Sequence, residues 1–331
     1  MLSSIEDKVA RYVADCGLLS ATDRVLVGLS GGADSVCLML MLQRLGYECA
    51  AVHCNFHLRG AESVRDEEFV RQLCERLGVR LHLADFDTEG FAHRRRLSVE
   101  LAARTLRYDH FQQLMQSEGY TKLAVGHHMD DNAETFLLRA VRKTGVSGLC
   151  GIRPLSVNSQ GTTVVRPLLC LRREQVEVYL RERGESWVTD STNLEDEAAR
   201  NRVRHMVIPA LQTVSRQAVG NICSTMENLR EVLKVYEAEM QRCIGLCVRR
   251  EGDTVCIDRR RLQTCVSPLS VLHEVLWPLG FNETQIRNLL TAKGYRPNRP
   301  KDSARPMRLR GGRGTAAVEI SWEEIRVTLA G

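Results

Sequence analysis

Short apolar runs alternate with helical patterns along the first half of the chain. The runs lie near residues 24–29, 48–54, 79–84 and 122–126. Between them, "SVCLMLMLQRLG", "SVRDEEFVRQLCERLG" and residues 98–117 carry apolar side chains at helical spacing. Strands that alternate with helices predict a parallel sheet covered by helices. The expected fold class is therefore α/β, a doubly wound parallel sheet.

The pattern changes beyond Pro209. The stretch "TTVVRPLLCLRREQVEVYLRERG" still predicts strand, turn and helix, so the sheet is expected to continue to about residue 185. Residues 215–250 predict one or two long amphipathic helices, followed by strand-like "TVCIDRR", helical "LSVLHEVLWPLG" and the closing strands "TAAVEIS" and "EIRVTLA". Residues 294–314, rich in Pro, Gly and Arg, predict a loop. We expect an α/β domain over 1–212 and a helical and small α+β region over 213–331.

Composition narrows the class of protein. No run of about eighteen uncharged apolar residues is present, so a membrane span is not expected. The start "MLSSIEDKVARYVADCGLL" contains acidic residues and no small-residue cleavage site, which favours an amphipathic helix over a signal peptide. We therefore expect the protein to be cytoplasmic. The twelve cysteines are scattered, without a C-x-x-C motif, so we expect reduced thiols and no zinc or iron–sulfur site. The net charge of +5 is a weak indication of a polyanionic partner.

The stretch "VLVGLSGGADSVCLMLML" places a polar loop between the first strand and its helix. Ligands bind beyond the carboxyl ends of the strands in such sheets. Gly31 and Gly32 allow positive φ and a close approach of the backbone, while Ser30 and Ser35 offer hydroxyl groups at the positive end of the helix. The loop, Ser30, Gly31, Gly32, Ala33, Asp34 and Ser35, is therefore predicted to bind an anion such as phosphate.

The loop matches neither the Walker A motif nor the dinucleotide fingerprint. Asp34 would repel a phosphate unless a cation lay between them, so the loop predicts Mg²⁺. The alternative is an ordinary strand-to-helix turn in which Asp34 and Ser35 only cap the helix.

The motif S-G-G-x-D-S resembles the PP-loop of the N-type ATP pyrophosphatases. That resemblance implies an enzyme that cleaves ATP between the α- and β-phosphates, holds pyrophosphate in the loop and activates an oxygen as its adenylate. It leaves the substrate open, because the superfamily includes several synthetases and tRNA-modifying enzymes.

Four further segments, in order between about residues 20 and 215, resemble the tRNA(Ile)-lysidine synthetases. They are "HCNFHLRGAESVRDEEFVRQLCERLGV" (53–79), "ELAARTLRYDHF" (100–111), "VGHHMDDNAETFLLRAVRKTGVSGLCGI" (125–152) and the stretch from "RPLL" to "RNRVRHMVIPAL". The resemblance implies that ATP, with Mg²⁺, adenylates position 2 of the wobble cytidine of tRNA(Ile) with a CAU anticodon. The ε-amine of free L-lysine then displaces AMP and forms lysidine.

Carboxylates and arginines gather at the predicted ligand edge. Asp130, Asp131 and Glu134 lie in the first turn of the helix after the fourth strand, where they could hold Mg²⁺ or receive the lysine amine. Their alternative role is to stabilise the helix start, worth about 0.3–1 kcal/mol each. Arg104 and Arg107 share one helical face and could contact an adenylate or RNA phosphate; the alternative is a solvated basic face.

With the resemblance, the candidate residues fall into four sets. The catalytic candidates are Asp34, Asp131, Glu134 and Arg104; the ATP contacts are the loop residues 30–35 with His53 and His127; the substrate and tRNA contacts are His57, Arg59, Arg107, Arg200, Arg202 and Arg204; and the metal ligands are Asp34, through pyrophosphate, and Asp130.

Two other functions stay open at this point. A tRNA thiolase of the same superfamily would adenylate its substrate but deliver sulfur, and the missing C-x-x-C motif argues against it. A non-catalytic RNA-binding module would use the loop only as structure. Longer lysidine synthetases carry a further C-terminal RNA-binding domain that this chain is expected to lack, and a homodimer is left open.

Overall fold

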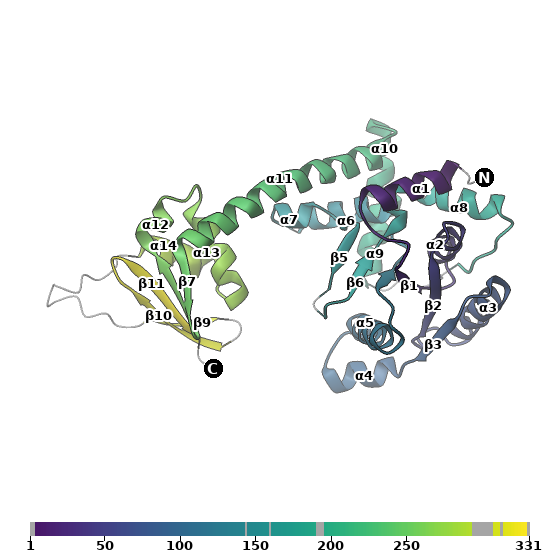
Figure 1. The fold of residues 1–331 in the computed structure, drawn as a ribbon, viewed down its shortest axis with the longest axis horizontal. Coiled ribbons are helices and arrows are strands. Elements are labelled where there is room, and N and C mark those ends of the chain that lie inside the picture. The colour runs from purple at the N-terminus through teal and green to yellow at the C-terminus, as the bar shows by residue number, and fades with distance from the viewer. Residues whose placement is uncertain are drawn as a thin grey trace. The chain divides into compact units, whose positions relative to one another are not determined.

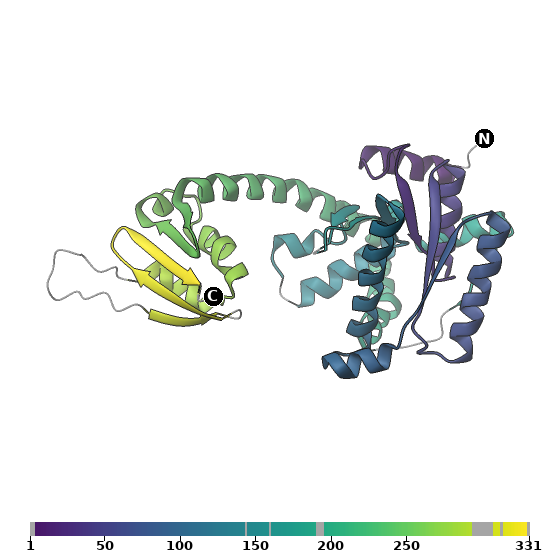
Figure 2. The same ribbon diagram turned by 60° about the horizontal axis from the view of Figure 1, so that its bottom comes forward.

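The computed structural model describes residues 4–142, 144–158, 160–189, 195–292, 307–311 and 314–329 (Figures 1 and 2). Contacts between residues divide the chain into two compact units, Met1–Leu229 and Arg230–Gly331. No helix in the described ranges is both long and apolar enough to cross a membrane.

The first unit is built on a six-stranded sheet with the order β3-β2-β1-β4-β6-β5. Its strands are β1 (Arg24–Gly28), β2 (Glu48–Asn55), β3 (Leu81–Asp85), β4 (Lys122–Ala124), β5 (Leu155–Val157) and β6 (Thr163–Val165). All neighbours are parallel except β5 and β6. The order reverses between β1 and β4, the place where ligands bind in doubly wound sheets. The predicted α/β fold and its four strands are confirmed.

Helices cover both faces of this sheet. They are α1 (Ser4–Asp15), α2 (Ala33–Arg44), α3 (Ala61–Leu77), α4 (Thr88–Arg95), α5 (Val99–Glu118), α6 (Met129–Val141), α7 (Val146–Leu149), η1 (Pro167–Cys170) and α8 (Arg173–Glu182). Because side chains alternate along a strand, Val25 and Val27 pack with α1, α2, α3 and α8, whereas Leu26 packs with Phe111 and Met115 of α5.

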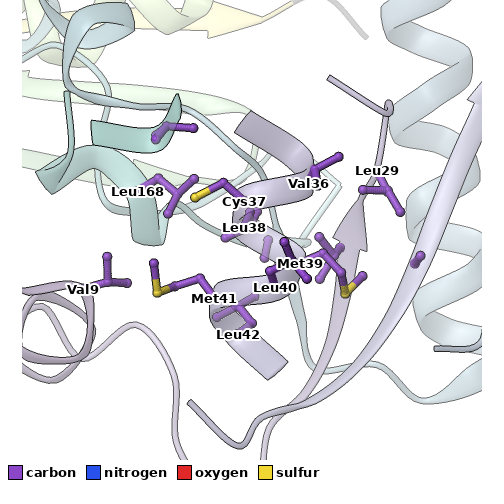
Figure 3. Packing of buried hydrophobic residues seen from close by; sticks show 14 of the residues in the cluster. Val9, Leu29, Val36, Cys37, Leu38, Met39, Leu40, Met41, Leu42 and Leu168 are labelled. Atoms are coloured by element: carbon purple, nitrogen blue, oxygen red, sulfur yellow. The ribbon is translucent and has the colours of Figure 1, made fainter. Parts of the chain in front are cut away.

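Helix α2 forms the centre of the larger core. Every side chain from Val36 to Leu42 is buried, and Figure 3 shows them pointing outward on different sides of the helix, toward Leu168 of η1 and toward Leu29 after β1. A helix that is apolar all round is a buried helix. This burial holds the loop at the start of α2 on a rigid support.

The first unit ends in a series of short helices. These are α9 (Glu195–Arg202), the π-helical turn η2 (Val203–Val207), α10 (Ile208–Val214) and the beginning of α11 (Ala218–Cys247). The predicted boundary near 212 lies in α10, whereas the contacts divide the chain inside α11. The reason is that Val219 of α11 packs with Val203 and Ile208, while Cys243 and Cys247 belong to the core of the second unit.

The second unit is a small α+β fold, as predicted. Its antiparallel sheet has the order β7-β8-β11-β10-β9. The elements are β7 (Val248–Glu251), β8 (Thr254–Asp258), α12 (Arg259–Gln263), α13 (Pro268–Leu276), η3 (Trp277–Leu279), α14 (Glu283–Thr291), β9 (Met307–Gly311), β10 (Gly314–Ile320) and β11 (Glu324–Leu329). Residues 294–306 of the predicted loop lie outside the described residues. The predicted loop was wrong at residues 307–311, which form strand β9 and pair with β10.

Candidate active site

The loop after β1 is held together by Ser35. The hydroxyl oxygen of Ser35 accepts a hydrogen bond from the Ser30 amide at 3.1 Å and donates one to the Gly32 carbonyl at 2.9 Å. Gly32 is the N-cap residue of α2, and no side chain among the described residues caps this helix. Asp34 and Ser35 therefore do not act as the cap that the alternative interpretation required. The start of α2 instead presents backbone amides to the loop, as in phosphate-binding sites.

Gly31 fits this loop for two reasons. Its φ of +91° lies in the region that favours glycine. A Cβ atom at Gly31 would also lie 2.7 Å from Cγ2 of Val188, whose amide donates to the Gly31 carbonyl at 3.0 Å. The segment after α8 thus packs directly against the loop.

Gly126 lets β4 approach the start of α2. A Cβ atom at Gly126 would lie 2.9 Å from the carbonyl carbon of Asp34 and 3.1 Å from the amide nitrogen of Ser35. These are backbone atoms at the start of a buried helix, so they cannot move independently of it. The position of the loop therefore depends on a residue without a side chain at the end of β4.

We expect Gly126→Ala to push β4 away from the loop. Overpacking at such a contact costs about 1–3 kcal/mol of unfolding free energy, and we expect ATP to bind about tenfold more weakly. The measurements are chemical denaturation and equilibrium ATP binding. Gly220→Ala in α11 is the matched control: its Cβ would meet nothing within 4 Å, so up to about 1 kcal/mol of stabilisation is expected. Unchanged ATP affinity in Gly126→Ala would contradict the prediction.

Two cavities formed by the described residues reach this loop, and both are lined by Ser30, Gly32, Asp34 and Asp131. The aromatic cavity, of about 390 Å³, is also lined by Val52, Cys54, Phe56, Arg104, Arg107, Tyr108, Phe111, His127 and Arg200. The charged cavity, of about 650 Å³, is also lined by His128, Asp130, Glu134, Arg172, Arg173, Glu177, Trp187 and Arg204. Asp34 and Asp131 thus face both a space with aromatic rings and arginines and a space with several carboxylates and arginines.

Asp34 combines one satisfied and one unsatisfied oxygen. Its Oδ2 pairs with Nη1 of Arg173. Its Oδ1 is buried and has no hydrogen-bond partner in the described ranges, although Nε2 of His128 lies 3.7 Å away. Burial raises the pKa of Asp34, and the nearby His128 and Arg173 oppose that rise.

The structure fits a magnesium ion that is held partly by phosphate. The described residues contain no group of three or more His, Cys, Asp or Glu side chains arranged to hold a metal. In nucleotide enzymes, Mg²⁺ commonly uses one or two carboxylates together with substrate phosphates and water. The unpaired Oδ1 of Asp34, beside the phosphate-type loop, matches that ligand type.

Asp130 and Asp131 have different partners. Oδ1 of Asp130 lies 2.9 Å from Nη2 of Arg172, and its Oδ2 accepts from the Arg173 amide at 2.8 Å. Oδ2 of Asp131 accepts from the His128 amide at 3.0 Å in a capping box at the start of α6. Asp131 therefore does stabilise its helix start, and it also lines both cavities. Both oxygens of Asp130 are already engaged.

Glu134 is fully buried in a pair with Arg204. Its Oε1 lies 2.7 Å from Nε of Arg204, and its Oε2 accepts from Nη2 of the same residue at 3.1 Å. Nε of Arg200 lies 3.5 Å from Oε2. Burial raises the pKa of Glu134 even though Arg204 opposes it. The carboxylate thus anchors the arginines of α9 and η2 to α6.

The histidines are placed on different sides of the site. His127 lines the aromatic cavity, its Nδ1 is buried without a hydrogen-bond partner in the described part of the chain, and burial lowers its pKa to about 4. It is therefore neutral at physiological pH. His53 is buried on the face of β2 opposite Val52 and Cys54, and its Nδ1 donates to the Leu29 carbonyl at 2.9 Å. It supports the strand end without lining either cavity.

Arg104 and Arg107 of α5 line the aromatic cavity together, as the spacing predicted. The guanidinium of Arg104 lies 5.0 Å from the ring centre of Tyr108, and that of Arg107 lies 5.0 Å from the ring centre of Phe56. Stacking on aromatic rings orients a guanidinium while leaving its N–H groups available. These arginines are therefore positioned for an anionic ligand.

Three of the predicted tRNA contacts lie outside both cavities. His57 pairs with Asp85 at 2.9 Å and lines a separate hollow of about 320 Å³ at the ends of β2 and β3. Arg59 pairs with Asp66 at 3.2 Å. Arg202 is exposed on α9. Arg200 and Arg204, in contrast, reach the aromatic and the charged cavity respectively.

Arg172 and Arg173, at the start of α8, belong to the site and were not predicted. Their pairs with Asp130 and Asp34 join residues 42 and 139 positions apart in the sequence. The available signal was their position directly after β6 and η1, at the same sheet edge as the loop.

Comparisons with known proteins show the family of the chain. A family model described as a PP-loop domain matches residues 1–211. The tRNA(Ile)-lysidine synthase of Bacteroides thetaiotaomicron is 42% identical over 295 residues, which cover 89% of this chain and 67% of that protein. The one of Porphyromonas gingivalis is 41% identical over 293 residues, covering 88% and 63%. The chain thus spans about two thirds of the length of these curated relatives.

One solved structure is similar in fold. The U34-tRNA thiolase NcsA from Methanococcus maripaludis, solved with its [4Fe-4S] cluster, superposes with a TM-score of 0.56 at 17% identity. The match covers 69% of this chain and 78% of the thiolase. At this level of identity the likeness concerns the fold alone.

Proposed function

The chain belongs to the tRNA(Ile)-lysidine synthase family of PP-loop proteins, and from this premise we propose that it forms lysidine in tRNA(Ile) with a CAU anticodon. The observation that carries the proposal is the meeting of two unlike cavities at Asp34 and Asp131. One cavity suits a nucleotide, and the other offers carboxylates and arginines to an amino acid.

The aromatic cavity is the proposed site of ATP. PP-loop proteins use ATP, and the loop Ser30–Ser35 lines this cavity, where the backbone amides at the start of α2 would bind its phosphates. Phe56, Tyr108 and Phe111 provide ring surfaces for the adenosine. Asp34 would hold Mg²⁺ through the pyrophosphate group, and the ion would supply positive charge to the phosphates.

In the first step, O2 of the wobble cytidine bonds to the α-phosphorus of ATP. The bond between that phosphorus and the bridging oxygen breaks, and pyrophosphate leaves. Arg104 and Arg107 line the cavity of the loop and would stabilise the negative charge on the reacting phosphate. Their fixed stacking positions mean that little reorganisation is needed.

In the second step, the ε-nitrogen of lysine bonds to C2 of the cytidine, and the C2–O bond to AMP breaks. The ammonium group must first lose a proton. Asp131 is the proposed acceptor, because it lines both cavities. Glu134, enclosed by its pair with Arg204, would instead keep that arginine and Asp131 in place, since Nη2 of Arg204 lies 3.7 Å from Oδ1 of Asp131.

The other proposed tRNA contacts are basic side chains outside the reaction steps described above. Arg200 and Arg204 would contact tRNA close to the reacting base, while His57, Arg59 and Arg202 would contact it farther away. We also propose residues 213–331 as a tRNA-binding part of the protein, which would act where tRNA is found, in the cytoplasm.

Sulfur transfer is the weaker alternative. Cys54 is the cysteine that lines the aromatic cavity, and burial raises its pKa to about 12. It is therefore a thiol at neutral pH, and the thiolate is the reactive form. A non-catalytic RNA-binding module has no use for the unpaired oxygen of Asp34 beside the loop.

The direct test is transfer of radiolabelled lysine to an unmodified tRNA(Ile) transcript with a CAU anticodon. We expect label in the tRNA only when ATP is present, with AMP and pyrophosphate formed in equal amounts. A transcript with uridine at the wobble position is the matched control and should stay unlabelled. Formation of AMP and pyrophosphate without lysine label would contradict the proposed nucleophile and favour sulfur transfer.

A further inference from the structure

Arg173 occupies the charged cavity without a role in either chemical step. It is the first residue of α8, and its Nη1 pairs with Oδ2 of Asp34. Its Nε donates to Oε1 of Glu177 at 3.0 Å, and its amide is held by Asp130. The side chain is 40% exposed and lines the charged cavity while its Nε and Nη1 are held by the two carboxylates.

The guanidinium of Arg173 pairs with the carboxylate that is proposed to hold the metal ion. Asp34 is the proposed carboxylate ligand of Mg²⁺, yet one of its oxygens already binds a fixed positive charge. A cation at Asp34 and this guanidinium would repel each other at close range. The other oxygen, Oδ1, is buried without a hydrogen-bond partner in the described residues. Oδ2 of Asp34 is thus paired with a positive charge, whereas its Oδ1 is available to a ligand.

We propose that Arg173 is a positioning residue that changes partners when Mg²⁺ and ATP bind. Before binding, it neutralises Asp34 and holds it in place. With the metal at Asp34, Arg173 moves to the β- and γ-phosphates, because the loop residues Ser30 and Gly32 line both the aromatic cavity proposed for ATP and the charged cavity that Arg173 lines. The planar guanidinium suits bidentate binding of phosphate. This inference rests on the proposed ATP site and adds a competition between an arginine and Mg²⁺ for one carboxylate.

The test is the Mg²⁺ dependence of nucleotide binding without tRNA or lysine. The probe is a fluorescent α,β-methylene analogue of ATP, which cannot be cleaved between the α- and β-phosphates. In Arg173→Ala we expect the half-saturating Mg²⁺ concentration to fall at least about threefold, because the competing cation is gone. At saturating Mg²⁺ the analogue should bind about tenfold more weakly, whereas AMP affinity is unchanged, because only the outer phosphates lose a contact.

Two further variants separate this role from a structural one. Arg181→Ala removes another arginine of α8 that pairs with Glu177 at 2.9 Å but does not line the cavity, and should leave both quantities unchanged. Arg173→Lys keeps the charge without the planar fork and should give an intermediate Mg²⁺ requirement. An unchanged or higher Mg²⁺ requirement in Arg173→Ala, or equal weakening of the ATP analogue and AMP, would overturn the inference.

The Mg²⁺ test of Arg173 and the lysine-transfer assay can fail separately. If wild-type protein transfers lysine but Arg173→Ala shows no shift in Mg²⁺ requirement, only the partner change of Arg173 is overturned. If the shift is found but lysine is not transferred, the partner change is supported and the proposed nucleophile is overturned.

Discussion

Replacing Asp34 by asparagine should reduce lysine transfer at least about 10²-fold, the scale seen when one preorganised electrostatic group is removed from an active site. Asparagine has nearly the same shape, so the loop and its Ser30–Ser35 hydrogen bond should persist. What disappears is the negative charge that pairs with Arg173 and that is proposed to hold Mg²⁺. Because adenylation comes first, pyrophosphate release should fall by the same factor as lysine transfer.

The measurement compares lysine label and pyrophosphate release for wild type and Asp34→Asn at equal tRNA concentration. Asp253→Asn, in an exposed turn between β7 and β8, is the control for loss of one acidic charge and should retain activity. If Asp34→Asn keeps both rates within about threefold of wild type, the carboxylate is not part of the reaction.

Replacing Glu134 by alanine should have the largest effect on stability. The change leaves the guanidinium of Arg204 facing a buried hole, with Arg200 beside it. Breaking a buried ion pair by removing one partner costs about 3–5 kcal/mol, and we expect about 3 because Arg204 is itself half exposed. Glu134→Gln keeps the shape and one acceptor, so its loss of unfolding free energy should be smaller.

Chemical denaturation followed by a signal from the first unit measures this effect. Glu283→Ala breaks an exposed pair with Arg287 of the second unit and should change the unfolding free energy by less than about 1 kcal/mol. A Glu134→Ala protein as stable as wild type, with weaker binding of lysine, would show that Glu134 contacts substrate and does not act through Arg204.

Local signals explain what the sequence could predict. Strand and helix positions in the first unit follow from hydrophobic periodicity, which depends on neighbouring residues and on burial of one face or both. The loop Ser30–Ser35 is a continuous stretch whose glycines and hydroxyls indicate an anion site by themselves. Arg104 and Arg107 were predicted to share a face because their spacing fixes it.

The unpredicted parts depend on contacts between distant segments. The pair between Asp34 and Arg173 spans 139 positions, and the pair between Glu134 and Arg204 spans 70. Arg204 was predicted as a site residue and Arg173 follows η1 at the sheet edge of the loop, but nothing local to either arginine indicates which carboxylate it contacts. Edge strand β5 was not predicted either, because it is a short segment whose strand conformation depends on pairing with β6.

Helix α11 is shared by two hydrophobic cores, and this has a consequence for the order in which the protein unfolds. Val219 and Met226 are buried near its beginning, and Cys243 and Cys247 near its end. The helix has no break between them, so disrupting either core would fray one end of a hydrogen-bonded segment that the other core still holds. Leu233 is the one side chain buried between Met226 and Met240 of this helix, so amide hydrogens in the middle of α11 should exchange with solvent faster than those at the two ends that the cores hold.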